Sequence, residues 1–82
     1  MVKVKFHTLL QKATGVDSHE SSARNVASLL DEVRRRYGEE TSRYLKGCIV
    51  LVNGKNIGYL AGTRTKLSDG DEVSLFPPVA GG

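Results

Sequence analysis

Cysteine is almost absent from this chain of 82 residues, which contains only Cys48. A single cysteine excludes an internal disulfide, and with only two distant histidines the chain offers no standard zinc site. Long apolar runs are also missing, since no stretch approaches the roughly 20 residues that span a bilayer. The N-terminus alternates Val-Lys-Val-Lys and so lacks the apolar core of a signal peptide. We therefore expect a cytoplasmic protein without membrane contact.

Motifs of an independent enzyme are missing too. The sequence has no Gly-rich phosphate-binding loop and no nucleophile–base constellation. We therefore expect no bound cofactor, no metal and no catalytic site that works without a partner. Whether the chain is a subunit of a larger enzyme is left open by these absences.

The charge balance is mildly basic, with a net charge of +3. The densest cationic cluster is Arg34-Arg35-Arg36, but four acidic residues flank it and no aromatic residues are interleaved with it. Nucleic-acid binding needs a basic face that neutralises several phosphates, usually with stacking or groove-reading elements. The pattern favours a solvated helix face over nucleic-acid binding, and the charge would assist docking on an acidic partner.

The clearest helix is predicted to follow Asn25, a residue type that suits the N-cap position. Gly38 lies where a left-handed C-terminal cap is expected. Between them, apolar residues recur at helical spacing and form one stripe: Val26, Leu29, Leu30, Val33 and Tyr37. Two acidic-first pairs four residues apart are expected on the outer side: Asp31 with Arg35, and Glu32 with Arg36.

Two stretches have clear strand patterns before the last turn of the chain. Residues 2–6 alternate apolar and charged side chains, as in a half-buried strand. Residues 48–52 form a continuous apolar run, which is typical of a strand covered on both faces. Asn53-Gly54 follows this run and is the strongest short hairpin signal, because a type I′ turn needs positive φ at both central residues.

The last strand is predicted over residues 72–76, after a tight turn at residues 68–71. Its side chains alternate, so Phe76 faces away from Val73 and Leu75. Weaker patterns predict a helical turn or loop over residues 8–14, an edge strand over 16–22, a short helix over 39–46, a return strand over 55–57 and a loop over 58–66. The whole predicts one small α+β domain over residues 1–76, with a mixed sheet packed on one main helix.

Residues 77–82 form a distinct C-terminal tail. Pro77 and Pro78 are the only prolines, and they end sheet pairing and favour an extended chain. Val79, Ala80, Gly81 and Gly82 then shrink in size toward an unhindered carboxylate. Four residues reach about 13 Å, which suits insertion into a narrow channel. The alternatives are a frayed end or a tag remnant.

Taken together, these motifs resemble the ubiquitin-like sulfur carriers of the MoaD/ThiS family, and most of all the small subunit of molybdopterin synthase. The resemblance spans nearly the whole chain. It is carried by residues 2–6, the helix after Asn25, Val52-Asn53-Gly54, residues 67–73 and residues 76–82. It implies a β-grasp fold. The double proline favours the pterin branch over the thiamin branch of the family.

The resemblance also implies a mechanism and partners. An E1-like adenylating enzyme would use ATP to convert Gly82 into an acyl-adenylate. A persulfide enzyme would then supply the sulfur that leaves Gly82 as a thiocarboxylate. The tail, from Pro77 to Gly81, would insert into the large subunit of molybdopterin synthase, and the two subunits would form a heterotetramer. The final cofactor would carry molybdenum or tungsten.

Two other functions remain open from the sequence. A ubiquitin-like modifier would also begin with adenylation of Gly82, but would end in an isopeptide bond to a target lysine. A basic binding module with an incidental diglycine is the third and weakest alternative. The first two share the same terminus, so the residues do not separate them.

Individual residues outside the tail carry weaker hypotheses. Phe76 would either anchor a partner, as aromatic residues often do at interface centres, or pack locally against Pro77 or a strand neighbour. His7 is expected to be structural or solvated, and Cys48 to act as a small buried hydrophobe. His19 is expected to be isolated and exposed. In the loop after the hairpin, Arg64 and Lys66 would meet an acidic surface of the activating enzyme or, as the composition favours, remain solvated.

Overall fold

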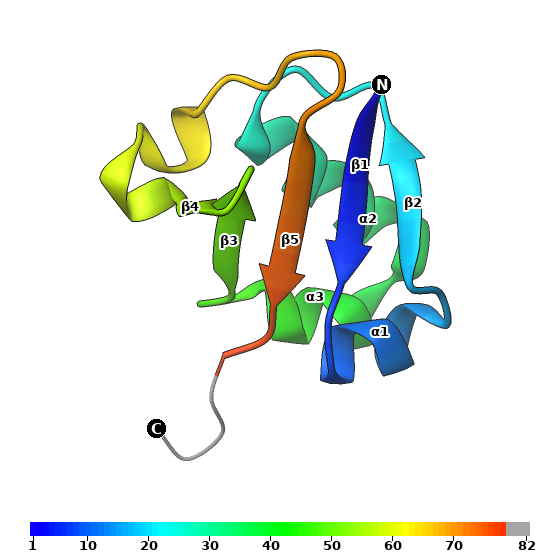
Figure 1. Ribbon diagram of the computed structural model, residues 1–82. Coiled ribbons are helices and arrows are strands. Elements are labelled where there is room, and N and C mark those ends of the chain that lie inside the picture. The colour runs from blue at the N-terminus through cyan, green and yellow to red at the C-terminus, as the bar shows by residue number, and fades with distance from the viewer. Residues whose placement is uncertain (79–82) are drawn as a thin grey trace.

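The computed structural model describes residues 1–78, which form a five-stranded sheet with its helices packed on one face (Figure 1). The strands are β1 (Val2–Phe6), β2 (Ser18–Ser21), β3 (Ile49–Val52), β4 (Lys55–Asn56) and β5 (Glu72–Phe76). The helices are α1 (Leu9–Thr14), α2 (Val26–Tyr37) and α3 (Glu39–Leu45), and two 3₁₀ turns follow β4, η1 (Ile57–Tyr59) and η2 (Gly62–Arg64). The strand order is β2-β1-β5-β3-β4, with β1 and β5 parallel and the other pairs antiparallel. This confirms the predicted mixed sheet on one main helix.

The core lies between the sheet and α2. In the two central strands, β1 and β5, alternate apolar residues face the helices, and Val4 pairs in register with Val73. The predicted stripe of α2 meets them, with Leu29 and Val33 fully buried. Each such side chain contributes roughly 1.5–3 kcal/mol when it is removed from water. The alternation that marked these strands in the sequence therefore reports the helix-covered face of the sheet.

Helix α2 begins as predicted and ends differently. The Oδ1 atom of Asn25 accepts a hydrogen bond from the backbone N–H of Ser28 at 2.7 Å, which completes the N-cap. Gly38 has the expected positive φ of 86°, but its ψ of −169° is extended, so the prediction of a left-handed cap is wrong. The reason is that Gly38 also begins α3, with its carbonyl accepting from the backbone N–H of Ser42. This combination of angles is accessible to glycine alone.

The hairpin prediction is confirmed. Asn53 and Gly54 have φ values of 50° and 85°, as a type I′ turn requires. The Asn53 side chain also fastens the hairpin to the start of β5: its Oδ1 accepts from the backbone N–H of Glu72 at 2.9 Å, and its Nδ2 donates to Asp71 at 3.0 Å. Asp71 in turn accepts from the backbone N–H of Ser68 at 2.8 Å and closes the predicted turn. Both of its hydrogen bonds lower the pKa of the Asp71 carboxyl.

Two strand predictions need correction. Residues 48–52 were expected to form a strand covered on both faces, but β3 begins at Ile49 and is covered on one face only. Val50 and Val52 are buried, whereas the side chain of Ile49 is 41% exposed and that of Leu51 is half-buried. Helices α2 and α3 lie on the other side of the sheet and α1 lies at its end (Figure 1), which leaves this face open. The return strand is also shorter than predicted, because residue 57 already begins η1.

His19 is the residue whose prediction was most in error. It was expected to be exposed, yet its side chain is 7% exposed. In the register of β1 with β2, His19 pairs with Val4 and so faces the helices. Its Nδ1 lies 2.7 Å from the hydroxyl of Tyr37, and its ring packs edge-on against Phe6. Burial lowers the pKa of His19, and the nearby charge of Arg36 lowers it further.

Charged residues on α2 match one of the two predicted pairs. Asp31 and Arg35 form an ion pair at 2.9 Å. Glu32 does not pair with Arg36 as predicted. It accepts a hydrogen bond from the Ser21 hydroxyl at 2.7 Å, because β2 runs beside this face of the helix. Among residues 1–78, no helix is long and apolar enough to cross a membrane.

Candidate functional site: the open sheet face at the base of the tail

The sheet face that the helices leave uncovered changes character along its length. Along β1 and at the start of β5 it is charged, with Lys5 and Glu72 joined by an ion pair at 2.8 Å. The hydrogen bond and charge of Lys5 lower the pKa of the exposed Glu72 carboxyl. Toward the end of β5 the face becomes apolar, because Ile49 of β3 lies beside Phe76 of β5. The apolar half is therefore the half that adjoins the tail.

An apolar groove lies at this end of the sheet, with a volume of about 580 Å³. We refer to it as the tail-base groove. It is lined by Thr8, Leu9, Ile49, Leu51, Phe76, Pro77 and Pro78. Leu9 of α1 and Ile49 of β3 are both exposed at this groove, although both side chains are apolar. Single exposed apolar residues are common, but adjacent ones of this kind mark sites of protein–protein contact.

Phe76 lines the groove beside the tail. Its ring stacks on the imidazole of His7, with centroids 4.1 Å apart and planes inclined by 8°. The backbone N–H of His7 donates to the carbonyl of Leu75 at 3.1 Å, which holds the histidine alongside β5. Phe76 thus faces away from Val73 and Leu75, as predicted. It packs on His7, a neighbour not considered from the sequence, and also lines the groove.

The two prolines carry the chain out of the sheet. Pro77 and Pro78 are half-buried and line the groove. Pro78 lies against Gly47, where a Cβ atom would be 4.0 Å from the Cβ atom of the proline. Of the predicted site residues, Val79, Ala80, Gly81 and Gly82 lie outside the described part of the chain. The structure therefore places the base of the tail, and the predicted reacting residue follows four positions after Pro78.

Cys48 lies near this base, but its surroundings do not activate its thiol. It precedes β3, is half-buried and packs against the core. Burial raises the pKa of its thiol, although the charge of Arg34 acts in the opposite direction. A thiol with a raised pKa is a weak nucleophile at neutral pH. These observations agree with the predicted role as a small hydrophobe.

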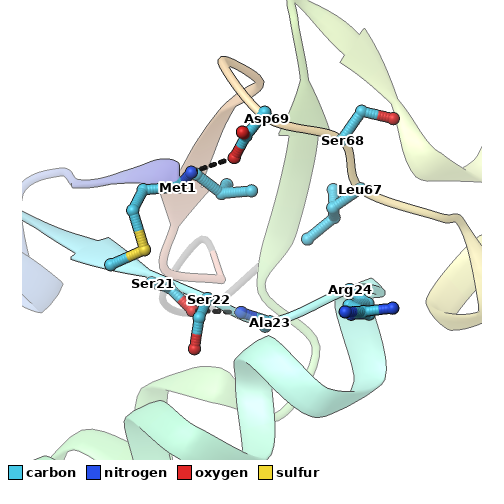
Figure 2. A pocket seen from close by; sticks show the side chains of 9 residues that line it. Met1, Ser21, Ser22, Ala23, Arg24, Leu67, Ser68 and Asp69 are labelled. Carbon is cyan, nitrogen blue, oxygen red and sulfur yellow. Dashed lines mark hydrogen bonds and ion pairs between the residues drawn. The ribbon is translucent and has the colours of Figure 1, made fainter.

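A second pocket lies at the opposite end of the sheet. It has a volume of about 430 Å³ and its side chains, shown in Figure 2, come from the start of β1, the end of β2 and the turn before β5. The amino group of Met1 pairs with Asp69 across its upper edge. Since β1 and β5 run parallel, the start of β1 is a full strand length from Phe76. This pocket is therefore separate from the tail-base groove.

Apart from Phe76, the groove residues outside the tail were not predicted as a site. Leu9 and Leu51 attracted no functional interpretation, because apolar residues in a helix or strand are normally read as core. One signal was present in the sequence. An unbroken apolar run such as residues 49–52 indicates a strand shielded on both faces, whereas residues 1–78 cover only one.

Comparison with known proteins agrees with the fold. The ThiS family model matches residues 4–82. Over the full length of both chains, the sequence is 30% identical to the molybdopterin synthase sulfur carrier subunit of Escherichia coli. It is 61% identical over 33 residues to small archaeal modifier protein 3 of Haloferax volcanii, which is 40% of this chain and 36% of that protein. It is 42% identical over 53 residues to a putative sulfur carrier protein of Archaeoglobus fulgidus, 65% of this chain and 56% of that protein. The matches thus span less than two thirds of these two archaeal relatives.

Solved structures give the same result. Small archaeal modifier protein 1 of Methanosarcina acetivorans superposes with a TM-score of 0.84 at 32% identity, covering 99% of this chain and 95% of that one. A chain in the complex of subunits 1 and 2 of molybdopterin-converting factor from Helicobacter pylori gives a TM-score of 0.70 at 26% identity, covering 99% and 97%. The fold is therefore the ubiquitin-like β-grasp that the sequence predicted. The chain belongs to the ThiS family of ubiquitin-like sulfur carriers.

Proposed function

We propose that this chain is the sulfur-donating small subunit of molybdopterin synthase. The observation that carries the proposal is the tail-base groove, an open apolar surface lined by Phe76, Pro77 and Pro78 among others. A partner that fills this groove is placed at the root of the tail. The remaining residues, 79–82, then have the reach to deliver the terminal carboxylate into the partner's interior.

The groove gives a physical reason for partner binding. Leu9, Ile49 and Phe76 leave apolar area in water that no element of the described chain covers. Removing such area from water stabilises an association by roughly 25 cal/mol per Å² before the entropic cost of binding. Aromatic side chains at the centre of such patches carry most of the binding energy in many interfaces. The apolar run of β3 then has both its faces covered in the complex.

Chemistry in this proposal occurs at Gly82. One carboxylate oxygen attacks the α-phosphate of ATP on an E1-like enzyme, pyrophosphate leaves, and an acyl-adenylate forms. The terminal sulfur of a persulfide donor then attacks the carbonyl carbon, and AMP leaves. A thiol of the donor or of the activating enzyme attacks the inner sulfur of the resulting acyl disulfide, which releases the thiocarboxylate and leaves a disulfide between the two thiols. ATP is bound by the activating enzyme, and this chain contributes the reacting carbonyl and its presentation. Gly81 keeps the approach to that carbonyl free of side chains.

The large subunit is the second proposed partner. The Helicobacter pylori structure is by its title a complex of subunits 1 and 2, and the Escherichia coli relative carries the name of a synthase subunit. Both support a pairing in which the tail of this chain enters a large subunit and gives up its sulfur to a pterin precursor. Two copies bound to a large-subunit dimer would make a heterotetramer.

A second function is favoured by other relatives. Two of the similar proteins are small archaeal modifiers, one by sequence and one by structure. In that case the adenylated Gly82 ends in an isopeptide bond to a lysine of a target protein. Adenylation is common to both functions, so only the fate of the activated glycine separates them.

Intact mass spectrometry of the protein from its native cells tests the proposal. A chain with one terminal oxygen replaced by sulfur is the expected result. Conjugates of higher mass, with a diglycine remnant on target lysines and no thiocarboxylate, would favour the modifier. A variant that lacks Gly81 and Gly82 is the control, since it should show neither product while it keeps the same fold by circular dichroism.

A further inference from the structure

A second exposed patch lies at the β4 edge of the sheet, on the segment after β4. Residues 57–66, which we name the Tyr59 lobe, contain η1 and η2 packed together at the edge of the sheet. Figure 1 shows the lobe, in yellow-green to yellow, projecting beyond β4. The side chain of Tyr59 is 89% exposed, more than any other large hydrophobic residue in the described chain. It contributes little to the core, so packing does not explain it.

The lobe presents Tyr59 on an ordered support. The Asn56 side chain accepts from the backbone N–H of Gly58 at 2.8 Å and fixes the start of η1. The buried hydroxyl of Thr65 accepts from the N–H of Ala61 at 3.1 Å and donates to the carbonyl of Gly62 at 2.7 Å. The carbonyl of Thr65 accepts from Val26 at the start of α2. An aromatic residue on such a support loses little conformational freedom when it is bound.

One residue pair links the groove to the start of the lobe. Leu51 lines the groove and pairs in register with Asn56, the residue that caps η1. A protein that covers Leu51 therefore lies one strand spacing, about 4.8 Å, from the residue that precedes the lobe. The lobe itself is cationic. Arg64 and Lys66 are both exposed, and residues 57–66 contain no acidic residue.

We infer that the Tyr59 lobe is a second contact for the protein that adenylates the tail, and that it fits an acidic surface on that protein. The inference rests on the proposed function. The activating enzyme is the fitting occupant because adenylation is required whether Gly82 becomes a thiocarboxylate or an isopeptide. Cations beside an exposed aromatic complement carboxylates around an apolar depression. Nucleic acid is the poorer occupant, since the lobe offers one aromatic ring and two cations, too few to follow a phosphate backbone.

Pyrophosphate exchange with the purified cognate activating enzyme, MgATP and the full chain tests this inference. Tyr59→Ala should raise the KM for the chain about tenfold or more with kcat unchanged, and Tyr59→Phe should restore most of the affinity. Arg64→Glu should also raise KM, with an effect that shrinks as salt is added. Arg35→Glu is the control, because it reverses another exposed charge, on α2 behind the sheet, and should leave KM within about twofold.

The outcomes are distinct. Wild-type exchange with unchanged KM in both lobe variants overturns the inference and leaves the proposed function standing. Impaired binding of the large subunit alone, with normal exchange, also overturns it. Absence of exchange with the wild-type chain refutes adenylation, and the inference falls with it. Loss of affinity for nucleic acid instead of the activating enzyme, measured with a single-stranded oligonucleotide, assigns the lobe to the other occupant and contradicts the proposal.

Discussion

The phenyl ring of Phe76 and the imidazole of His7 lie face to face, with centroids 4.1 Å apart, at the point where the chain leaves the sheet. One residue ends β5 and the other follows β1, and the parallel pairing of these strands brings them together. The stack fixes one face of Phe76 and leaves the groove side of the ring for a partner. Residues separated by almost the whole chain thus form the base of the tail.

Phe76→Ala is predicted to weaken binding of the large subunit by a factor of about ten or more, because a central aromatic side chain is removed from the groove. Isothermal titration calorimetry measures the change. Ser74→Ala is the matched control, since Ser74 lies on the same face of β5 and outside the groove. Equal affinities for the wild type and the Phe76 variant would show that the groove is not the docking surface.

Ile49→Glu is predicted to abolish the same binding with little effect on folding. The side chain is already 41% exposed, so a carboxylate there stays in water in the free chain but is buried without a partner in the complex. The neighbouring core residue gives the opposite result: Leu75→Ala, fully buried, should cost about 2–5 kcal/mol in the free energy of unfolding. Urea denaturation measures the stability of both variants, and calorimetry measures their binding. A large loss of stability in Ile49→Glu, or its normal binding to the large subunit, would contradict this assignment.

Stability is predicted to fall in mild acid because of His19. Its pKa is lowered in the folded chain by burial, so the unfolded chain binds a proton more readily and the folded state loses stability as pH falls through the unfolded pKa of about 6.5. Urea midpoints at about pH 7.5 and about pH 5.5 measure this loss. His19→Phe should make the loss smaller. The same decrease in the variant as in the wild type would assign the acid sensitivity to other groups.

Asn53→Ala is predicted to destabilise the chain by about 1–3 kcal/mol. The substitution removes both side-chain hydrogen bonds to the start of β5 and places alanine at a φ of 50°. Asn56→Ala is the control, because it also removes an asparagine side chain with one bond to the backbone but at a negative φ. Thermal unfolding should rank Asn53→Ala as clearly the less stable variant, and a reversed order would contradict the role of Asn53 as the tie between hairpin and β5.

Local patterns were sufficient for most of the fold. The stripe of α2, the alternation of β1 and β5 and the Asn53-Gly54 turn depend on spacings of a few residues, and each was predicted correctly. The register of β2 was not accessible in this way. His19 is buried because it pairs with Val4 and meets Tyr37, contacts that join three separate elements. A single histidine in a polar segment carries no local signal of such an environment.

The groove shows a second limit of reading a sequence. The apolar run of β3 indicates shielding from water on both faces, but it does not say which molecule supplies the shield. The tail was proposed from its composition and order alone, from Pro77 to Gly82. Its surroundings were not, because Leu9 and Leu51 reach it only through the strand order and the placement of α1.

Sulfur transfer from the chain to a pterin precursor tests the central claim most directly. Thiocarboxylated chain is incubated with the large subunit and the precursor, and its intact mass is followed over time. The account predicts that the terminal sulfur is lost and a carboxylate returns at Gly82 only when both large subunit and precursor are present, and more slowly with Phe76→Ala. Retention of the sulfur under these conditions, or its equal loss without the large subunit, would contradict the assignment to molybdopterin synthase.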